Sequence, residues 1–121
     1  MNFWKPGTLT SVFFAAITYN LPGAALTAEE LLTLCKEPVT QGYCEGYVAG
    51  FYDGRTTSDY GQLALRSCPP SDSTGDRLAV SYTQMVRVFT KWAEKYPEKL
   101  HYRDWQAVRE SLAQAWPCRP E

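Results

Sequence analysis

The sequence predicts a small all-α protein, a four-helix bundle closed by two disulfides. Apolar residues recur at intervals of three and four in several segments, as they do on the buried face of a helix. No segment shows the alternation of apolar and polar residues that is typical of a strand. The chain has 121 residues, which suits one domain, and its four cysteines are an even number that can pair completely.

The charge balance argues against nucleic acid as a partner. The formal net charge is −1, and the isoelectric point is about 5.8. The chain has no run of basic residues. A basic patch is the usual electrostatic signature of a nucleic-acid-binding domain, so we expect no such partner here.

The N-terminal segment has the pattern of an export signal. Lys5 is the only charged side chain in the first 28 residues, and the mostly apolar run Leu9–Leu21 follows it. Small residues then occupy positions 23–25, as they do before a signal-peptidase site. We predict that residues 1–25 are a signal peptide and that residues 26–121 form the exported domain. An uncleaved anchor is the alternative, although the run is shorter than the ~20 residues that span a bilayer.

All the cysteines lie in the exported part: Cys35, Cys44, Cys68 and Cys118. Four cysteines in a small exported chain favour two disulfides. A zinc site is the rival interpretation, but the sequence contains no Cys-x-x-Cys pair and only one histidine. We therefore expect no metal and no cofactor.

The first helix is expected to begin at Thr27 and to stop before Pro38. Thr27 and Glu30 have the spacing of a capping box, in which each residue satisfies the backbone of the other. The apolar face of this helix would carry Leu31, Leu34 and Cys35.

The second helix, expected from about Thr40 to Arg55, carries a stripe of glycines. Gly42, Gly46, Gly50 and Gly54 fall four residues apart, and Tyr43, Tyr47 and Phe51 form a second row beside them. Each glycine destabilises a helix by about 0.5–1 kcal/mol relative to alanine, or on the order of 3 kcal/mol for the stripe. We expect close approach of another helix to offset this cost. That helix could belong to the same chain or to a second copy.

A long interval separates this helix from the next. Residues 56–75 are rich in Ser, Thr, Asp, Gly and Pro, with one short apolar turn from Tyr60 to Leu65. Loops of this length are usually functional or disordered. Ser73 and Asp76 have capping-box spacing and would start the third helix.

The last two helices have regular apolar stripes. Leu78, Tyr82, Met85, Phe89 and Trp92 mark the third helix, which should end at Tyr96-Pro97. Trp105, Val108, Leu112 and Ala115 mark the fourth, which should end at Trp116-Pro117.

Short connections favour antiparallel neighbours, and this arrangement suggests a disulfide pairing. Cys35 ends the first helix and Cys44 opens the second, so both belong at one end of the bundle. Cys68 precedes the third helix and Cys118 follows the fourth, so both belong at the other end. We therefore predict the bridges Cys35–Cys44 and Cys68–Cys118 among the three possible pairings.

The ordered set of motifs resembles a known family. The motifs are Tyr43-Cys44-x-Gly46-Tyr47-x-x-Gly50-x-x-Asp53, Cys68-Pro69-Pro70, Tyr96-Pro97-Glu98-Lys99-Leu100-His101 and Leu112-Ala113-x-x-Trp116-Pro117-Cys118. Together they are similar to the Rap/Tai family of immunity proteins, small exported all-α proteins that neutralise peptidoglycan amidases delivered by type VI secretion.

The resemblance implies a periplasmic homodimer that binds a toxin and is not an enzyme. A loop would occlude the Cys/His active-site cleft of the amidase. The matching loop here offers Thr56, Thr57, Ser58, Asp59, Tyr60, Ser71, Asp72 and Ser73 as toxin-binding residues. Gly42, Gly46, Tyr47, Gly50, Asp53 and Gly54 match the motif and would be structural.

Other functions find less support in the residues. His101 has no free cysteine to activate if all four cysteines are oxidised. Glu45 and Asp53 lie eight residues apart on one helix, about 12 Å along its axis, which is too far for paired-carboxylate catalysis. A periplasmic acid-stress chaperone, or another binding protein, remains the alternative of a different class.

Overall fold

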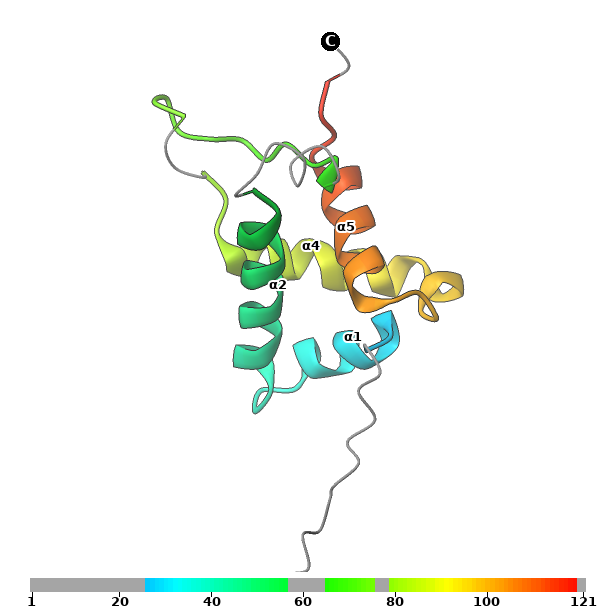
Figure 1. Cartoon of the computed structure of the whole chain (residues 1–121). Coiled ribbons are helices and arrows are strands. Elements are labelled where there is room, and N and C mark those ends of the chain that lie inside the picture. The colour runs from blue at the N-terminus through cyan, green and yellow to red at the C-terminus, as the bar shows by residue number, and fades with distance from the viewer. Residues whose placement is uncertain (1–25, 57–64, 76–78, 120–121) are drawn as a thin grey trace, which may run out of the picture.

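The residues that the structure describes form four α-helices and one short 3-10 turn. The computed structural model describes residues 26–56, 65–75 and 79–119 (Figure 1). The elements are α1 (Ala28–Lys36), α2 (Gln41–Thr56), α4 (Tyr82–Lys95), η1 (Pro97–Lys99) and α5 (Asp104–Ala115). The only β-type pairing in these segments consists of isolated bridges, so the predicted all-α class is confirmed.

The helices cross one another and do not all run side by side. In Figure 1, α2 and α5 stand on either side of the molecule, α4 passes behind them, and α1 lies across the lower end. Helix α4 contacts α1, α2 and α5, and α1 likewise contacts α2, α4 and α5. The expected antiparallel order of neighbouring helices is therefore replaced by crossings around α4.

Side chains from all four helices meet in a single core. The largest fully buried apolar side chains of the described helices are Leu31 from α1, Val48 from α2, Met85 and Phe89 from α4, and Val108 and Leu112 from α5. On α4 the buried residues include Met85, Phe89 and Trp92, as the apolar spacing predicts. Burial of a side chain of this size stabilises the fold by about 1.5–3 kcal/mol.

Helix α1 begins with the predicted capping box. The Thr27 hydroxyl accepts from the Glu30 backbone N–H at 3.2 Å, and the Thr27 N–H donates to the Glu30 carboxylate at 2.8 Å. Thr27 also pairs with Arg103 in an isolated bridge, which joins the start of α1 to the start of α5.

The predicted start of the third helix is wrong. Helix α4 begins at Tyr82, and its N-cap is Ser81, whose side chain accepts from the Gln84 N–H at 3.1 Å. Ser73 lies in a turn, where the Gly75 N–H donates to the Asp72 carbonyl at 3.0 Å. Gly75 has a φ of 78°, which is not helical, so the chain cannot enter a helix at this point.

Both predicted disulfides are present. Cys35 and Cys44 have Cα atoms 5.0 Å apart and join the end of α1 to the start of α2. Cys68 and Cys118 have Cα atoms 4.9 Å apart and join residues separated by 50 positions. The first bridge is buried in the core, whereas both cysteines of the second are exposed.

The expected contact of the glycine stripe with another helix of the same chain is wrong. Gly42, Gly46, Gly50 and Gly54 are exposed, and a Cβ atom added to any of them would meet no atom within 4 Å beyond the immediate chain and helix backbone. Tight packing within the described chain therefore does not offset the cost of the stripe.

Alanine at Gly46 or Gly50 should stabilise the dilute protein. Each substitution adds a methyl group in open space and improves helix propensity, so the free energy of unfolding should rise by about 0.5–1 kcal/mol. The measurement is urea denaturation followed by circular dichroism. Gly75→Ala is the matched control and should lose about 1 kcal/mol, because its φ of 78° is left-handed. A loss of stability in both α2 variants would contradict this account.

Candidate functional site: a projecting loop

The base of the long loop is fixed to the C-terminal end of α5. The Cys68 N–H donates to the Trp116 carbonyl at 2.8 Å, beside the Cys68–Cys118 disulfide. The buried Ser67 hydroxyl donates to the Leu112 carbonyl at 3.0 Å. Leu65 is only 1% exposed, so the chain is anchored by an apolar side chain just before these polar contacts.

A projection begins directly after this base. The Ala79 N–H donates to the Pro70 carbonyl at 3.0 Å and closes a neck, beyond which Val80 is buried. Within the projection, the Asp72 carboxylate accepts from the Thr74 hydroxyl at 2.7 Å and from the Thr74 N–H at 3.1 Å. Figure 1 shows the described part of this segment reaching away from the helices. We call the described residues of this segment, 70–75 and 79, the projecting loop.

The structure divides the predicted toxin-binding residues into three groups. Ser71 and Ser73 are exposed in the projecting loop, and Asp72 between them is half-buried. Thr56 is the last residue of α2. The remaining predicted residues lie outside the described part of the chain: Thr57, Ser58, Asp59 and Tyr60.

Asp53 joins α2 to the start of α4 near the loop. The Tyr82 hydroxyl lies 2.8 Å from each oxygen of the Asp53 carboxylate and donates to it. This hydrogen bond is the main reason that the pKa of Tyr82 is raised. Asp53 therefore links α2 to α4 through the side chain of Tyr82.

Tyr47 joins α2 to α5. Burial, followed by a hydrogen bond with the Asp104 carboxylate, raises the pKa of Tyr47 above its ordinary value of 10.0. Asp104 is 5% exposed and lies at the start of α5, where the negative charge of a carboxylate interacts favourably with the helix dipole. Tyr47 of the family motif therefore makes a structural contact between α2 and α5.

One feature of the surface was missed in the sequence. Arg55 continues the row of Tyr43, Tyr47 and Phe51 at the same spacing of four, and its guanidinium lies over Phe51 and over Trp105 of α5. The guanidinium of Arg109, four residues after Trp105 on α5, also lies over the Trp105 ring. The spacing on each helix is visible in the sequence, but the meeting of Arg55 with Trp105 depends on how the fold places α2 relative to α5.

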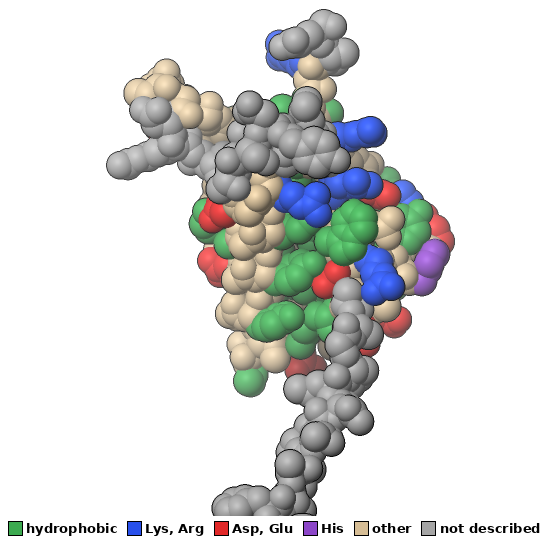
Figure 2. Space-filling model, viewed as in Figure 1, with side chains coloured by type: hydrophobic (Ala, Val, Ile, Leu, Met, Phe, Trp, Pro, Cys, Tyr) green, Lys and Arg blue, Asp and Glu red, His purple; other side chains and the backbone are tan. Residues whose placement is uncertain are grey.

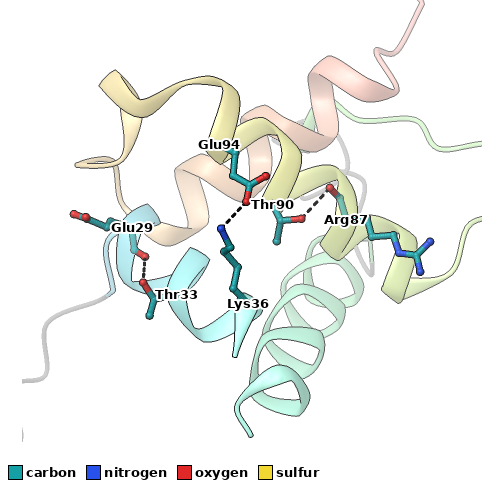
Figure 3. A network of polar contacts seen from close by, with 6 residues as sticks. All are labelled: Glu29, Thr33, Lys36, Arg87, Thr90 and Glu94. Carbon is teal, nitrogen blue, oxygen red and sulfur yellow. Dashed lines mark hydrogen bonds and ion pairs between the residues drawn. The ribbon is translucent and has the colours of Figure 1, made fainter. Parts of the chain in front are cut away.

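A hollow of about 330 Å³ lies between α1, α2 and α4. Figure 3 shows its polar wall, where the Lys36 ammonium pairs with the Glu94 carboxylate at 2.8 Å and the Thr90 hydroxyl donates to the Arg87 carbonyl at 3.1 Å. The side chains of the ion pair are 58% and 52% exposed, so it contributes only about 0–1 kcal/mol.

Among the described residues, no group of three His, Cys, Asp or Glu side chains could hold a metal ion. No helix in these segments has the length and apolar character needed to cross a membrane.

These features define a small all-α domain, stabilised by two disulfides, that presents an anchored loop at one end. Residues 27–118 match the family model of the Rap1a immunity proteins. The chain therefore belongs to the Rap1a immunity protein family, and membership indicates a role in toxin immunity. No curated protein and no solved structure matches the chain.

Stability should fall as the pH rises above 10. The pKa values of Tyr47, Tyr52 and Tyr82 are raised in the folded protein, so the folded state holds these protons more tightly than the unfolded state does. Their contribution is complete below the ordinary tyrosine pKa of 10.0 and is lost as the pH rises through the folded values. Urea denaturation at a series of pH values measures the slope.

Two phenylalanine variants test the sign of this effect. Tyr47→Phe should flatten the decline in the free energy of unfolding, because it removes one of the raised groups. Tyr96→Phe should remove a rise in stability just below pH 10 and leave the decline above pH 10 unchanged, because hydrogen bonding with Gln114 lowers the pKa of Tyr96. An unchanged slope in Tyr47→Phe would contradict the contact with Asp104.

Proposed function

We propose that this protein is a periplasmic immunity protein that binds a type VI-secreted peptidoglycan amidase and occludes its active-site cleft. The proposal is supported chiefly by the family match over residues 27–118 together with the anchored projecting loop. A loop that narrows at a neck and extends from the body has the shape required to enter a cleft.

Anchoring of the loop base favours binding. Ordering a flexible loop at an interface opposes association, and a loop held in place before binding avoids part of that cost. The Cys68–Cys118 disulfide and the Ser67–Leu112 hydrogen bond hold one side of the base, and the Pro70–Ala79 hydrogen bond closes the neck. The side chains proposed to touch the toxin are those of Thr56, Thr57, Ser58, Asp59, Tyr60, Ser71, Asp72 and Ser73.

The proposed location follows from the site of toxin action. An enzyme that cuts peptidoglycan acts outside the cytoplasmic membrane, so its inhibitor must be exported there. Both disulfides suit that oxidising compartment. Residues 1–25 would direct export and be removed afterwards. The protein would act by binding alone, without a catalytic step.

We further propose that the protein is a homodimer in which α2 faces its symmetry mate. The glycine stripe is exposed, and Tyr43 in the neighbouring row is 54% exposed. A two-fold axis would pack exposed Tyr43 of one copy against the glycine stripe of the other, since such interfaces are self-complementary. Phe51 and Arg55, which lie beside Trp105 of α5, would stay outside this contact.

Sedimentation equilibrium tests the dimer. Gly50→Leu should fill the stripe and weaken dimerisation by tenfold or more, while the chain remains folded because the added side chain meets no other helix. Arg87→Leu, an exposed site on α4, is the control and should leave the dimer intact. An unchanged dimer in Gly50→Leu would remove α2 from the interface.

A cell-derived partner and an inhibition assay test the central proposal. The tagged, exported protein is used to capture partners from its host under conditions in which type VI toxins are secreted. An amidase recovered in stoichiometric amount should lose its peptidoglycan-hydrolysing activity when the purified chain is added. Many unrelated envelope proteins at low yield would favour a chaperone instead.

The projecting loop should carry the inhibition. Ser73→Arg places a bulky charge on its exposed surface and should raise the inhibitory concentration at least tenfold, equivalent to about 1.4 kcal/mol. Val39→Arg is the matched control, because Val39 is 95% exposed in the connection between α1 and α2. Equal inhibition by the two variants would contradict a role for the loop.

A further inference from the structure

A second surface beside the loop base has the composition of a protein-binding site. The Arg55 guanidinium lies 5.1 Å from the centre of the Phe51 ring and 5.9 Å from that of Trp105. The Arg109 guanidinium lies 5.5 Å from the Trp105 ring. With Arg66, which lines a hollow together with Arg109, these residues form what we call the arginine–tryptophan surface. Figure 2 shows hydrophobic side chains along the middle of this face and basic side chains across its upper part.

The positive charge of this surface is not neutralised within the described chain. The ion pairs among the described residues are Lys36–Glu94 and Lys99–Glu110, and neither involves an arginine of the surface. Glu110 lines the hollow, but the Lys99 ammonium holds its carboxylate at 3.3 Å. Asp104 is buried and hydrogen-bonded to Tyr47.

The surface is held in a defined arrangement. Arg66 has a φ of 54°, and it lies between buried Leu65 and buried Ser67, so its backbone is fixed by both neighbours. Arg66 and Arg109 approach the same hollow of about 320 Å³ from the loop base and from α5. Stacking of Arg55 and Arg109 on aromatic rings restricts both guanidinium groups while leaving their N–H edges able to donate.

This arrangement suits carboxylates on a protein partner. A guanidinium binds a carboxylate through two parallel hydrogen bonds, and arginine and tryptophan are enriched among residues that dominate interface energetics. A second copy is disfavoured, because a two-fold axis through the surface would bring arginines against arginines. The surface also adjoins Ser67 and Cys68 at the loop base, so a partner held by the loop would reach it.

We propose that the arginine–tryptophan surface docks an acidic patch on the toxin and speeds their association. The choice of partner rests on the function proposed above. Complementary charge at an interface raises the association rate and makes it sensitive to salt, because the attraction acts before contact and is screened by ions. The loop would block the cleft, and this surface would select and orient the toxin.

Association kinetics with the captured amidase test the proposal. Rates are measured by stopped-flow fluorescence at 50 mM and 300 mM salt for the full exported chain. Arg109→Glu and Arg66→Glu should each slow association about tenfold or more at 50 mM salt. The association rates of both variants should also depend less on salt concentration. Arg87→Glu, an exposed charge reversal on α4, is the matched control and should stay within about twofold. Equal rates for all three variants would overturn the proposal.

A second experiment distinguishes failure of the docking-surface proposal from failure of the proposed function. If the chain inhibits no amidase, the proposed function fails, and a photo-crosslinking residue at exposed Gln114 in the hollow then tests the surface in the host. An adduct to an Asp/Glu-rich protein segment that disappears in Arg109→Glu would support an acidic partner. The proposal would be overturned by adducts to a second copy of the chain, to nucleic acid or to lipid, or by the absence of any adduct. Urea midpoints establish that each variant is folded, and the milder Arg109→Gln replaces any variant that is not.

Discussion

The Cys68–Cys118 disulfide joins the base of the projecting loop to the segment that follows α5, across 50 positions of sequence. The contacts beside it depend on that closure, since the Cys68 N–H and the Ser67 hydroxyl both reach carbonyls at the end of α5. A covalent link of this span can contribute about 4 kcal/mol by restricting the unfolded chain, on the chain-entropy account. It fixes the loop base against a rigid helix, and a fixed base is what the proposed mode of inhibition requires.

Local patterns in the sequence were sufficient to predict the all-α class and the presence of the helices. The capping box at Thr27, the apolar spacing of Met85 and Phe89, and the positions of the cysteines all depend on neighbours within a few residues or on helix ends. These features predicted four helices and both disulfides. The start of α4 was missed because Ser73 and Asp76 have capping-box spacing, while Gly75 in its left-handed conformation belongs to a turn. Spacing alone could not distinguish these two uses of the same residue types.

The rest depended on tertiary geometry that the sequence pattern does not contain. The glycine stripe predicted a close helix contact, but no helix of the described chain covers it. The four-residue spacing that places Arg55 in the aromatic row is visible in the sequence, yet its position over Trp105 follows from how the fold places α2 relative to α5. The candidate site was likewise predicted as a segment only. Its neck between Pro70 and Ala79 and its anchor on Leu112 appear only once the chain is folded.

Hydrogen–deuterium exchange on the complex tests the central claim most directly. The free chain and the chain saturated with its captured amidase would be compared peptide by peptide. The account predicts that the strongest added protection falls on residues 65–80 and on the amidase peptides that line its catalytic cleft. Inhibition accompanied by protection only at the α1–α2 connection, with the loop exchanging as it does in the free chain, would contradict occlusion of the cleft by the projecting loop.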